Sequence, residues 1–201
     1  MNKNEVKICG KVVAGLSYFH EINGERFYLL YIESERLSGY KDVIPVILSE
    51  NLIDTDMDYE GNAILVLGEY RSKNIEKEEK KHLILYLFAK NIEFINESYD
   101  LNEILLEGYV CKQPTYRLTP RGRKLTDVLI AVNRSYGKTS YIPCICWGDN
   151  ALFAERIEVG TKVEVEGRIQ SREYIKVLSN GEQKKLAYEV SVSRLEVNYE
   201  N

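Results

Sequence analysis

The chain has 201 residues, 44% of them hydrophobic, and a formal net charge of −4 at pH 7. This length fits two domains of about 100 residues each, and the composition excludes a disordered tail. No segment reaches the roughly 18 apolar residues of a membrane helix, and no signal peptide is visible, so no membrane partner is expected. The four cysteines and two histidines form no zinc-like spacing. We therefore expect no metal, no cofactor, and buried free thiols in a reducing cytoplasm.

The predicted elements of the N-terminal half are mostly strands. Alternating apolar residues predict a strand at 6–12, and a denser apolar run predicts another at 27–32. A weak helix is expected after Ser49, which can act as its N-cap, and before Gly61. An apolar run at 83–88 predicts the strand that closes this half.

The C-terminal half repeats this order. A dense apolar strand is expected at 128–132, and a short helix follows with Asp149 as a possible N-cap and Gly160 at its end. Alternating residues predict a strand at 163–169, and a final strand follows at 188–192.

The two halves match at an offset of about 98 residues. The segment 4–12 returns as 102–110, with the order of later motifs kept. Such self-similarity indicates a duplicated domain, so we expect domains at 1–97 and 101–201, called here the first copy and the second copy. Each has the order β-β-β-α-β-β of the OB-fold, a partly open five-stranded barrel. The sequence predicts an all-β protein of two tandem OB-fold barrels, with one short helix in each.

The two halves differ in charge. Residues 1–98 hold 12 Lys and Arg against 17 Asp and Glu, a balance of −5. Residues 99–201 hold 15 against 14, a balance of +1. Because the location of charge decides binding more than its sum, the acidic total does not exclude a nucleic-acid partner for the second copy.

No enzyme motif is visible: the chain has no G-x-S-x-G, no phosphate-cradling glycine loop and no His–Cys cluster, so no catalytic residues are expected. The second copy instead mixes aromatic and basic side chains. The aromatic candidates are Tyr136, Tyr141, Trp147 and Tyr174. The basic candidates are Arg117, Arg121, Arg123, Lys124, Arg134, Lys138, Arg168, Arg172 and Lys176. Bases of a single strand stack on exposed rings while cations neutralise phosphates, so this mixture predicts nucleic-acid binding that ignores sequence.

Core packing is the alternative for any one of these rings, because Tyr often fills a barrel core with its hydroxyl at the rim. The first copy acts as an internal control. It has Ser49 opposite Trp147, Ile75 opposite Tyr174 and Val43 opposite Tyr141, and only Tyr40 is a possible partner of Tyr136. Its last hairpin carries Glu76, Glu78 and Glu79, which would repel phosphates. Rings needed to build the barrel would be kept in both copies, so a functional role is favoured.

At these residues the second copy resembles the bacterial single-stranded DNA-binding proteins, over roughly residues 102–197. The matching motifs are 102–108, Pro114, Arg117, Gly122, 131–134, 142–148, Ala151, Gly160, Val163, 165–167, Arg172, Tyr174 and 188–190. The resemblance implies that Tyr136, Tyr141, Trp147 and Tyr174 are the base-stacking rings. The first copy resembles the family only in its framework.

The chain also departs from this family. Its members usually end in a glycine-rich segment with an acidic tip that recruits other enzymes, and usually form tetramers with one OB-fold per chain. This chain stops at 197–201 without such a tip, so tail-mediated recruitment of other proteins is not expected. Two OB-folds per chain imply a homodimer, in which the first copy is a structural or dimerising module.

The resemblance implies binding and protection of single-stranded DNA by the second copy, in replication, recombination or mobile-element transfer. Two alternatives stay open. OB-folds host many functions, so the chain could be a protein–protein adaptor without DNA binding. Stacking does not distinguish the sugar, so single-stranded RNA could be the ligand.

Overall fold

The computed structural model of the chain describes residues 3–77, 80–178 and 181–198. In the two hairpins that contain the internal gaps, the side chains of residues 76–82 and 176–181 lie outside this description. The acidic side chains at positions 76, 78 and 79 and the predicted site residue Lys176 therefore lie outside the described residues.

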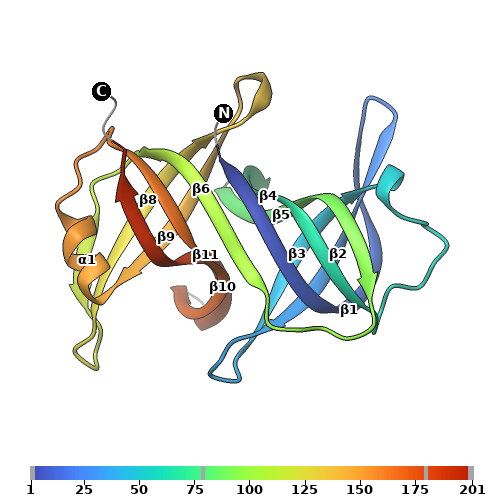
Figure 1. Cartoon of the computed structure of the whole chain (residues 1–201), viewed down its shortest axis with the longest axis horizontal. Helices are drawn as coiled ribbons and strands as arrows, with labels where there is room; N and C mark the ends of the chain where they lie inside the picture. Colours follow the sequence, from blue (N-terminus) through green and yellow to red (C-terminus); the bar gives the residue numbers. More distant parts are fainter. Residues whose placement is uncertain (1–2, 78–79, 179–180, 199–201) are drawn as a thin grey trace.

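The first copy is a closed five-stranded barrel (Figure 1). Its strands are β1 (Asn4–Ile22), β2 (Glu25–Glu35), β3 (Lys41–Ser49), β4 (Ala63–Lys77) and β5 (Lys80–Ile95). Strand β1 pairs with both β2 and β4, and β3 closes the barrel by pairing in parallel with β5. The alternation of apolar and polar residues along these strands turns one face of each toward the interior, as the sequence pattern predicts.

The second copy repeats the barrel. Its strands are β6 (Asn102–Val110), β7 (Thr115–Leu118), β8 (Lys124–Asn133), β9 (Thr139–Trp147), β10 (Lys162–Leu178) and β11 (Gly181–Val197). The long first strand of the first copy is here broken into β6 and β7 near Pro114, which has no N–H to donate to a ladder. The predicted all-β fold of two tandem OB-fold barrels is confirmed; each barrel closes by pairing, without the predicted partial opening.

The helices differ from their predicted bounds. In the second copy, α1 (Gly148–Glu155) has Trp147 rather than Asp149 at its N-cap, and it ends before Gly160. In the first copy only a single 3-10 turn forms, Glu50–Leu52, with the Asn51 N–H donating to Ser49 Oγ at 3.1 Å. The helix goes no further because the aspartates that follow bond to nearby backbone, as Asp54 does by accepting from the N–H of Asp56. Such local bonds compete with helical ones.

An antiparallel pairing of β1 with β6 joins the two barrels into one continuous sheet (Figure 1). Val6 lies opposite Ile104, its own counterpart in the repeat. Asn4 lies opposite Leu106, and Ile8 lies opposite Asn102. The pairing is unchanged when the two copies are exchanged, so the joint has an internal two-fold symmetry.

The base of each long hairpin crosses onto the other copy. On β4, the Ser72 N–H donates to Ser140 Oγ at 3.2 Å, and the Tyr141 N–H donates to Ser72 Oγ at 2.7 Å. On β10, the N–H and hydroxyl of Ser171 donate to Asp42 Oδ1 at 2.7 and 2.8 Å. These bonds hold the copies rigidly together, whereas the division into domains at 1–97 and 101–201 stays a prediction.

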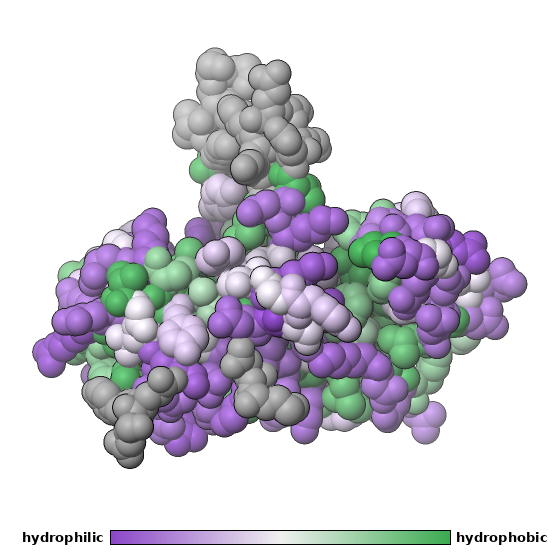
Figure 2. Space-filling model, turned by 90° about the horizontal axis from the view of Figure 1, so that it is seen from above, coloured by the Kyte–Doolittle hydropathy of each residue, from purple (hydrophilic) through white to green (hydrophobic). Residues whose placement is uncertain are grey.

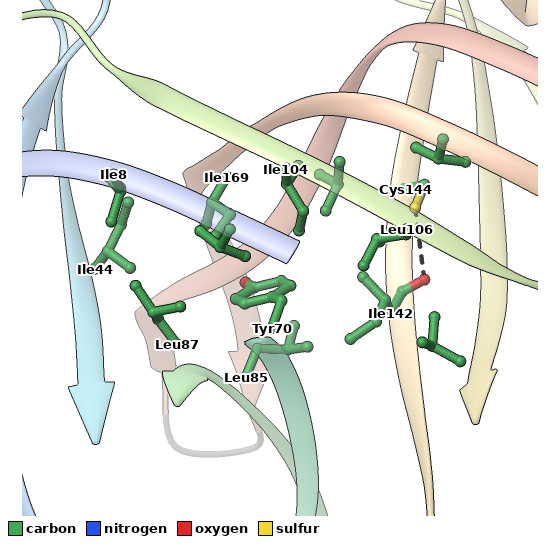
Figure 3. Close-up of a cluster of buried hydrophobic side chains, with 14 of the residues drawn as sticks. Ile8, Ile44, Tyr70, Leu85, Leu87, Ile104, Leu106, Ile142, Cys144 and Ile169 are labelled. Atoms are coloured by element: carbon green, nitrogen blue, oxygen red, sulfur yellow. Dashed lines mark hydrogen bonds between the residues drawn. The ribbon is translucent and has the colours of Figure 1, made fainter. Parts of the chain in front are cut away.

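The hydrophobic core continues across the joint (Figure 3). Tyr70 of β4 lies among Leu85 and Leu87 of its own copy and faces Ile142 and Ile104 of the second copy. Burial raises the pKa of Tyr70 well above its usual value. One shared core therefore stabilises both barrels, and each copy contributes to the packing of the other.

The cysteines are all free: Cys9, Cys144 and Cys146 are buried, and Cys111 is half-buried. Burial raises the pKa of Cys146 to about 12, so its thiolate is suppressed near neutral pH. Along the described part of the chain, no helix has the length and apolar character needed to cross a membrane. The same residues contain no group of three or more His, Cys, Asp or Glu side chains placed to hold a metal ion.

Candidate nucleic-acid interface

The outer face of β9 carries two of the predicted rings. Side chains alternate along the strand, so Ile142, Cys144 and Cys146 point inward and leave Tyr141 and Trp147 on the outer face. Tyr141 is 40% exposed and Trp147 is 36% exposed. At about 3.3 Å per residue, the six residue steps from one ring to the other span roughly 20 Å, which leaves room for several nucleotides.

Tyr174 lies on β10, two residues beyond Arg172, and is 38% exposed. The Arg172 guanidinium carbon lies 5.8 Å from the centroid of the Tyr174 ring, and Arg172 Nε lies 3.4 Å from Glu189 Oε2. The cation lies close enough to polarise the ring. A ring and a cation thus stand together at the side of the second barrel, as the sequence predicts.

Tyr136 is at the tip of the loop between β8 and β9, where it is 98% exposed. Its backbone is left-handed, with φ of 60°. The Arg134 N–H donates to the Lys138 carbonyl at 2.7 Å, and the Arg36 N–H donates to the Tyr40 carbonyl at 2.8 Å in the matching loop. Because these two hydrogen bonds are equivalent, the counterpart of Tyr40 in the second copy is Lys138. The predicted match of Tyr40 with Tyr136 is therefore wrong.

The predicted basic residues whose side chains are described fall into four groups. Arg117 is already paired, with Nε 2.8 Å from Asp127 Oδ2, and Arg172 is paired with Glu189. Arg168 turns toward the first copy, where its Nη2 donates to the Glu35 carbonyl at 3.3 Å. Exposed cations surround the β7–β8 turn, at Arg121, Arg123 and Lys124. Arg134 and Lys138 flank the loop of Tyr136.

Two adjoining clefts run beside these rings and share Pro143, Ala187 and Tyr188. One, of about 270 Å³, lies over the second barrel and is lined by Asp127, Arg172 and Glu189 among others. The other, of about 520 Å³, lies between the copies. Tyr174 lines this larger cleft, and Pro143 of β9, which lies between Tyr141 and Trp147 along the strand, lines both clefts.

The first copy contributes to the larger cleft, and the sequence pattern did not predict this contribution. Phe19, Tyr31 and Tyr86 line it together with Tyr174. These rings do not occupy positions that match the rings of the second copy, so a position-by-position comparison of the copies passes over them. A signal in the sequence could have found Tyr31 and Tyr86: they stand at the alternating positions of β2 and β5 whose side chains face outward.

A buried ion pair of the first copy holds the hairpin that carries Tyr174. Asp42, which is fully buried, accepts from Arg36 Nε and Nη2, both at 2.7 Å, and from Ser171. Arg36 Nη2 also donates to the Ser171 carbonyl at 2.6 Å. The hydrogen bond to Asp42 raises the pKa of Arg36. The Tyr188 hydroxyl adds a bond to the Val43 carbonyl at 2.9 Å, so the position of β10 and β11 depends on the first copy.

The surface of the molecule is mixed in polarity. Hydrophilic residues dominate the face seen in Figure 2, with smaller groups of hydrophobic residues between them.

The fold and the outer faces of β9 and β10 define a tandem OB-fold protein with exposed rings, one of them beside a cation. The model of the single-strand binding protein family matches residues 101–198. Single-stranded DNA-binding protein B of Bacillus subtilis is 35% identical over 83 residues, which cover 36% of this chain and 71% of that protein. The chain belongs to the single-strand binding protein family.

Other relatives are matched over less of their length. Single-stranded DNA-binding protein A of Bacillus subtilis is 33% identical over 81 residues, which cover 37% of this chain and 47% of that protein. The chain thus spans about half the length of this relative. The wild-type single-stranded DNA binding protein from Thermus aquaticus has the same fold over the whole chain, with a TM-score of 0.81 at 21% identity and 95% of that chain covered.

Proposed function

We propose that this chain binds single-stranded DNA without sequence preference, and that it protects exposed strands by binding and not by catalysis. The observation that carries the proposal is the outer face of β9 and β10, where Tyr141, Trp147 and Tyr174 are exposed and Tyr174 lines the larger of two adjoining clefts. Membership of the single-strand binding protein family and the DNA-binding names of its relatives support it.

The strand would pass along β9 of the second copy and into the cleft between the copies. Bases would stack on Trp147, Tyr141 and Tyr174, and Tyr136 would cover the strand at the loop tip. The exposed cations at Arg121, Arg123 and Lys124 would meet the phosphates at the opposite end. Arg117 and Arg172 contribute less charge, because each is paired with a carboxylate.

The first copy would act mainly as a structural module. Its Arg36–Asp42 pair holds the hairpin of the second copy, which supports this role. Its aromatic residues in the larger cleft would extend the path of the strand.

We also propose that the chain forms a homodimer with four OB-folds in a reducing cytoplasm. A strand is wrapped better by several barrels than by one pair, and the four free thiols fit a reducing compartment. Light scattering at micromolar concentration should return twice the mass of the chain, and a monomer at that concentration would contradict the dimer.

Trp147 is the single tryptophan of the chain, so its fluorescence reports directly on the proposed face. Titration with oligo-dT should quench this fluorescence, and the affinity should fall steeply as salt rises, since bound cations displace counterions. A protein–protein adaptor would show no salt-dependent quenching. Competition with RNA homopolymers separates a DNA ligand from an RNA ligand.

A further inference from the structure

A third pocket, of about 350 Å³, lies where the β4–β5 hairpin of the first copy meets the β8–β9 loop of the second copy. It adjoins the larger cleft and shares Ile47 and Tyr86 with it. Its other lining residues come from both copies and include His20, Arg71, Ser72, Lys73, Arg134 and Lys138. The pocket is therefore on the same path as the proposed strand.

The charge of this pocket is one-sided. Four of its lining residues are basic, namely Arg71, Lys73, Arg134 and Lys138, and none of the described lining residues is acidic. The adjacent carboxylate is Glu69, which pairs with Arg71 at 2.8 Å and also with Lys90. Within the described side chains, neither Lys73 nor Lys138 forms an ion pair.

Two polar atoms at the pocket are buried without a hydrogen-bond partner: Arg134 Nε and His20 Nδ1. Burial and the neighbouring Arg71 lower the pKa of Arg134, and burial and Lys73 lower the pKa of His20. Burial is the first cause of both shifts, and in each case a neighbouring cation acts in the same direction. A buried guanidinium N–H without an acceptor is costly in free energy, so the site is incomplete as it stands.

The internal symmetry of the chain shows what completes such a site. Arg134 is the counterpart of Arg36, and Ser140 is the counterpart of Asp42, 98 residues apart in each case. At Arg36 the carboxylate of Asp42 accepts both guanidinium bonds and the N–H of the hairpin serine. At Arg134 the position of that carboxylate holds only the Ser140 hydroxyl, which accepts from the Ser72 N–H.

The charge of the hairpin residues near the two arginines also differs between the copies. Gln170 and Glu189 of the second copy pair across β10 and β11, and their counterparts on β4 and β5 are Arg71 and Tyr86. Asp42 and, to a smaller extent, Glu189 raise the pKa of Arg36, whereas burial and then Arg71 lower the pKa of Arg134. One site carries its own anions, and the other has lost two carboxylates and gained a cation.

We propose that the pocket binds a phosphate group, supplied by the backbone of the bound single strand. This inference rests on the proposed function and adds a phosphate subsite built by both copies. A phosphate oxygen would take the place that the Asp42 carboxylate fills at Arg36, accepting from the Arg134 guanidinium. Lys73 and Lys138 would neutralise the remaining charge. Free inorganic phosphate has the same chemistry, and the experiment separates the two sources.

The sharpest variant is Ser140→Asp, which supplies the missing carboxylate from the protein itself. Ser140→Asn is the matched control, because an asparagine side chain has nearly the size of an aspartate side chain and carries no charge. Arg134→Gln removes the cation, and it serves as a second variant if Ser140→Asp fails to fold. Lys7→Gln changes the net charge by the same amount on β1, away from the pocket.

The first measurement is oligo-dT affinity at several salt concentrations. Ser140→Asp and Arg134→Gln should each weaken binding roughly tenfold or more, as loss of a charge-assisted hydrogen bond does. The slope of log affinity against log salt should flatten by ~0.7 for the lost phosphate contact. Ser140→Asn and Lys7→Gln should stay within about twofold of the parent, because surface charges act weakly in salt.

The second measurement is thermal unfolding in inorganic phosphate against chloride at equal ionic strength. Phosphate should raise the midpoint of the parent protein, and this shift should vanish in Ser140→Asp and Arg134→Gln. A phosphate shift with unchanged DNA affinity of both variants would overturn the backbone as the source. No shift and no loss of affinity would overturn the pocket altogether. If the parent protein fails to bind oligo-dT, the proposed function falls, and the phosphate shift alone decides whether the pocket binds an anion.

Discussion

Replacing Trp147 by alanine separates the role of its ring in binding from its role in the barrel. The ring is 36% exposed, so its exposed part is available for a base and the rest packs on the protein. Loss of one stacked base costs about 1–3 kcal/mol, or roughly 5- to 150-fold in affinity for oligo-dT. Fluorescence anisotropy of a labelled oligonucleotide measures this change without the tryptophan.

The same substitution also removes packing. An aromatic side chain buries about 150–250 Å² when fully covered, so roughly two thirds of that, about 100–160 Å², is lost here. At ~25 cal/mol per Å², the free energy of unfolding should fall by about 2.5–4 kcal/mol, as an upper value. Urea denaturation measures the loss, and binding is measured at a temperature where the variant stays folded.

Trp147→Leu is the matched control, because it restores most of the apolar packing and still removes the stacking face. Both variants should lose DNA affinity to a similar degree, while the leucine variant keeps most of the stability. An alanine variant that is destabilised but binds oligo-dT like the parent would refute the reasoning and assign the ring to the barrel alone.

Two further predictions concern the joint between the copies and its response to pH. Asp42→Ala leaves Arg36 without its buried partner, so urea denaturation should show that the free energy of unfolding falls by about 3–5 kcal/mol. Oligo-dT binding should also weaken, because the hairpin of Tyr174 is no longer held. Asp56→Ala, at an exposed aspartate, is the control, and a loss below about 1 kcal/mol in Asp42→Ala would contradict a structural role for the pair. Burial raises the pKa of Cys146 from 9.0 to about 12 and that of Tyr188 from 10.0 to about 12. Between these values the unfolded chain releases protons that the folded chain retains, so stability is full below about pH 9 and should fall as pH rises toward 12. Tyr188→Phe should reduce the slope of the urea midpoint against pH above 10, and a midpoint that stays constant from pH 8 to 11 would contradict the prediction.

Local pattern was sufficient to predict the barrels. Period-two alternation along each strand sets which side chains enter a core, and that alternation is visible in the sequence of both copies. The duplication then gave the tandem arrangement, because one repeated pattern implies one repeated fold. The exposed faces of Tyr141 and Trp147 follow from the same alternation on β9, since each strand residue has only two directions to point.

The helical segments show where local reading failed. Ser49 does cap a turn, but the aspartates after it take backbone hydrogen bonds that a helix would need. Trp147 rather than Asp149 is the N-cap of α1, because strand β9 runs directly into the helix. These boundaries depend on competition between several hydrogen bonds of similar strength, which a residue pattern does not rank.

The joint between the copies was decided by tertiary structure alone. The two-fold pairing of β1 with β6 and the crossing hairpins bring together residues about 70 to 130 positions apart, such as Ser72 with Ser140 and Asp42 with Ser171. The sequence by itself determined two barrels, and it predicted a face that mixes rings and cations on the second. Only their packing decided that the rings of the first copy line the same cleft as Tyr174, and that Arg134 lacks the carboxylate that Arg36 has. The physical reason is that alternation specifies the direction of a side chain relative to its own strand, whereas its partners depend on which strands meet.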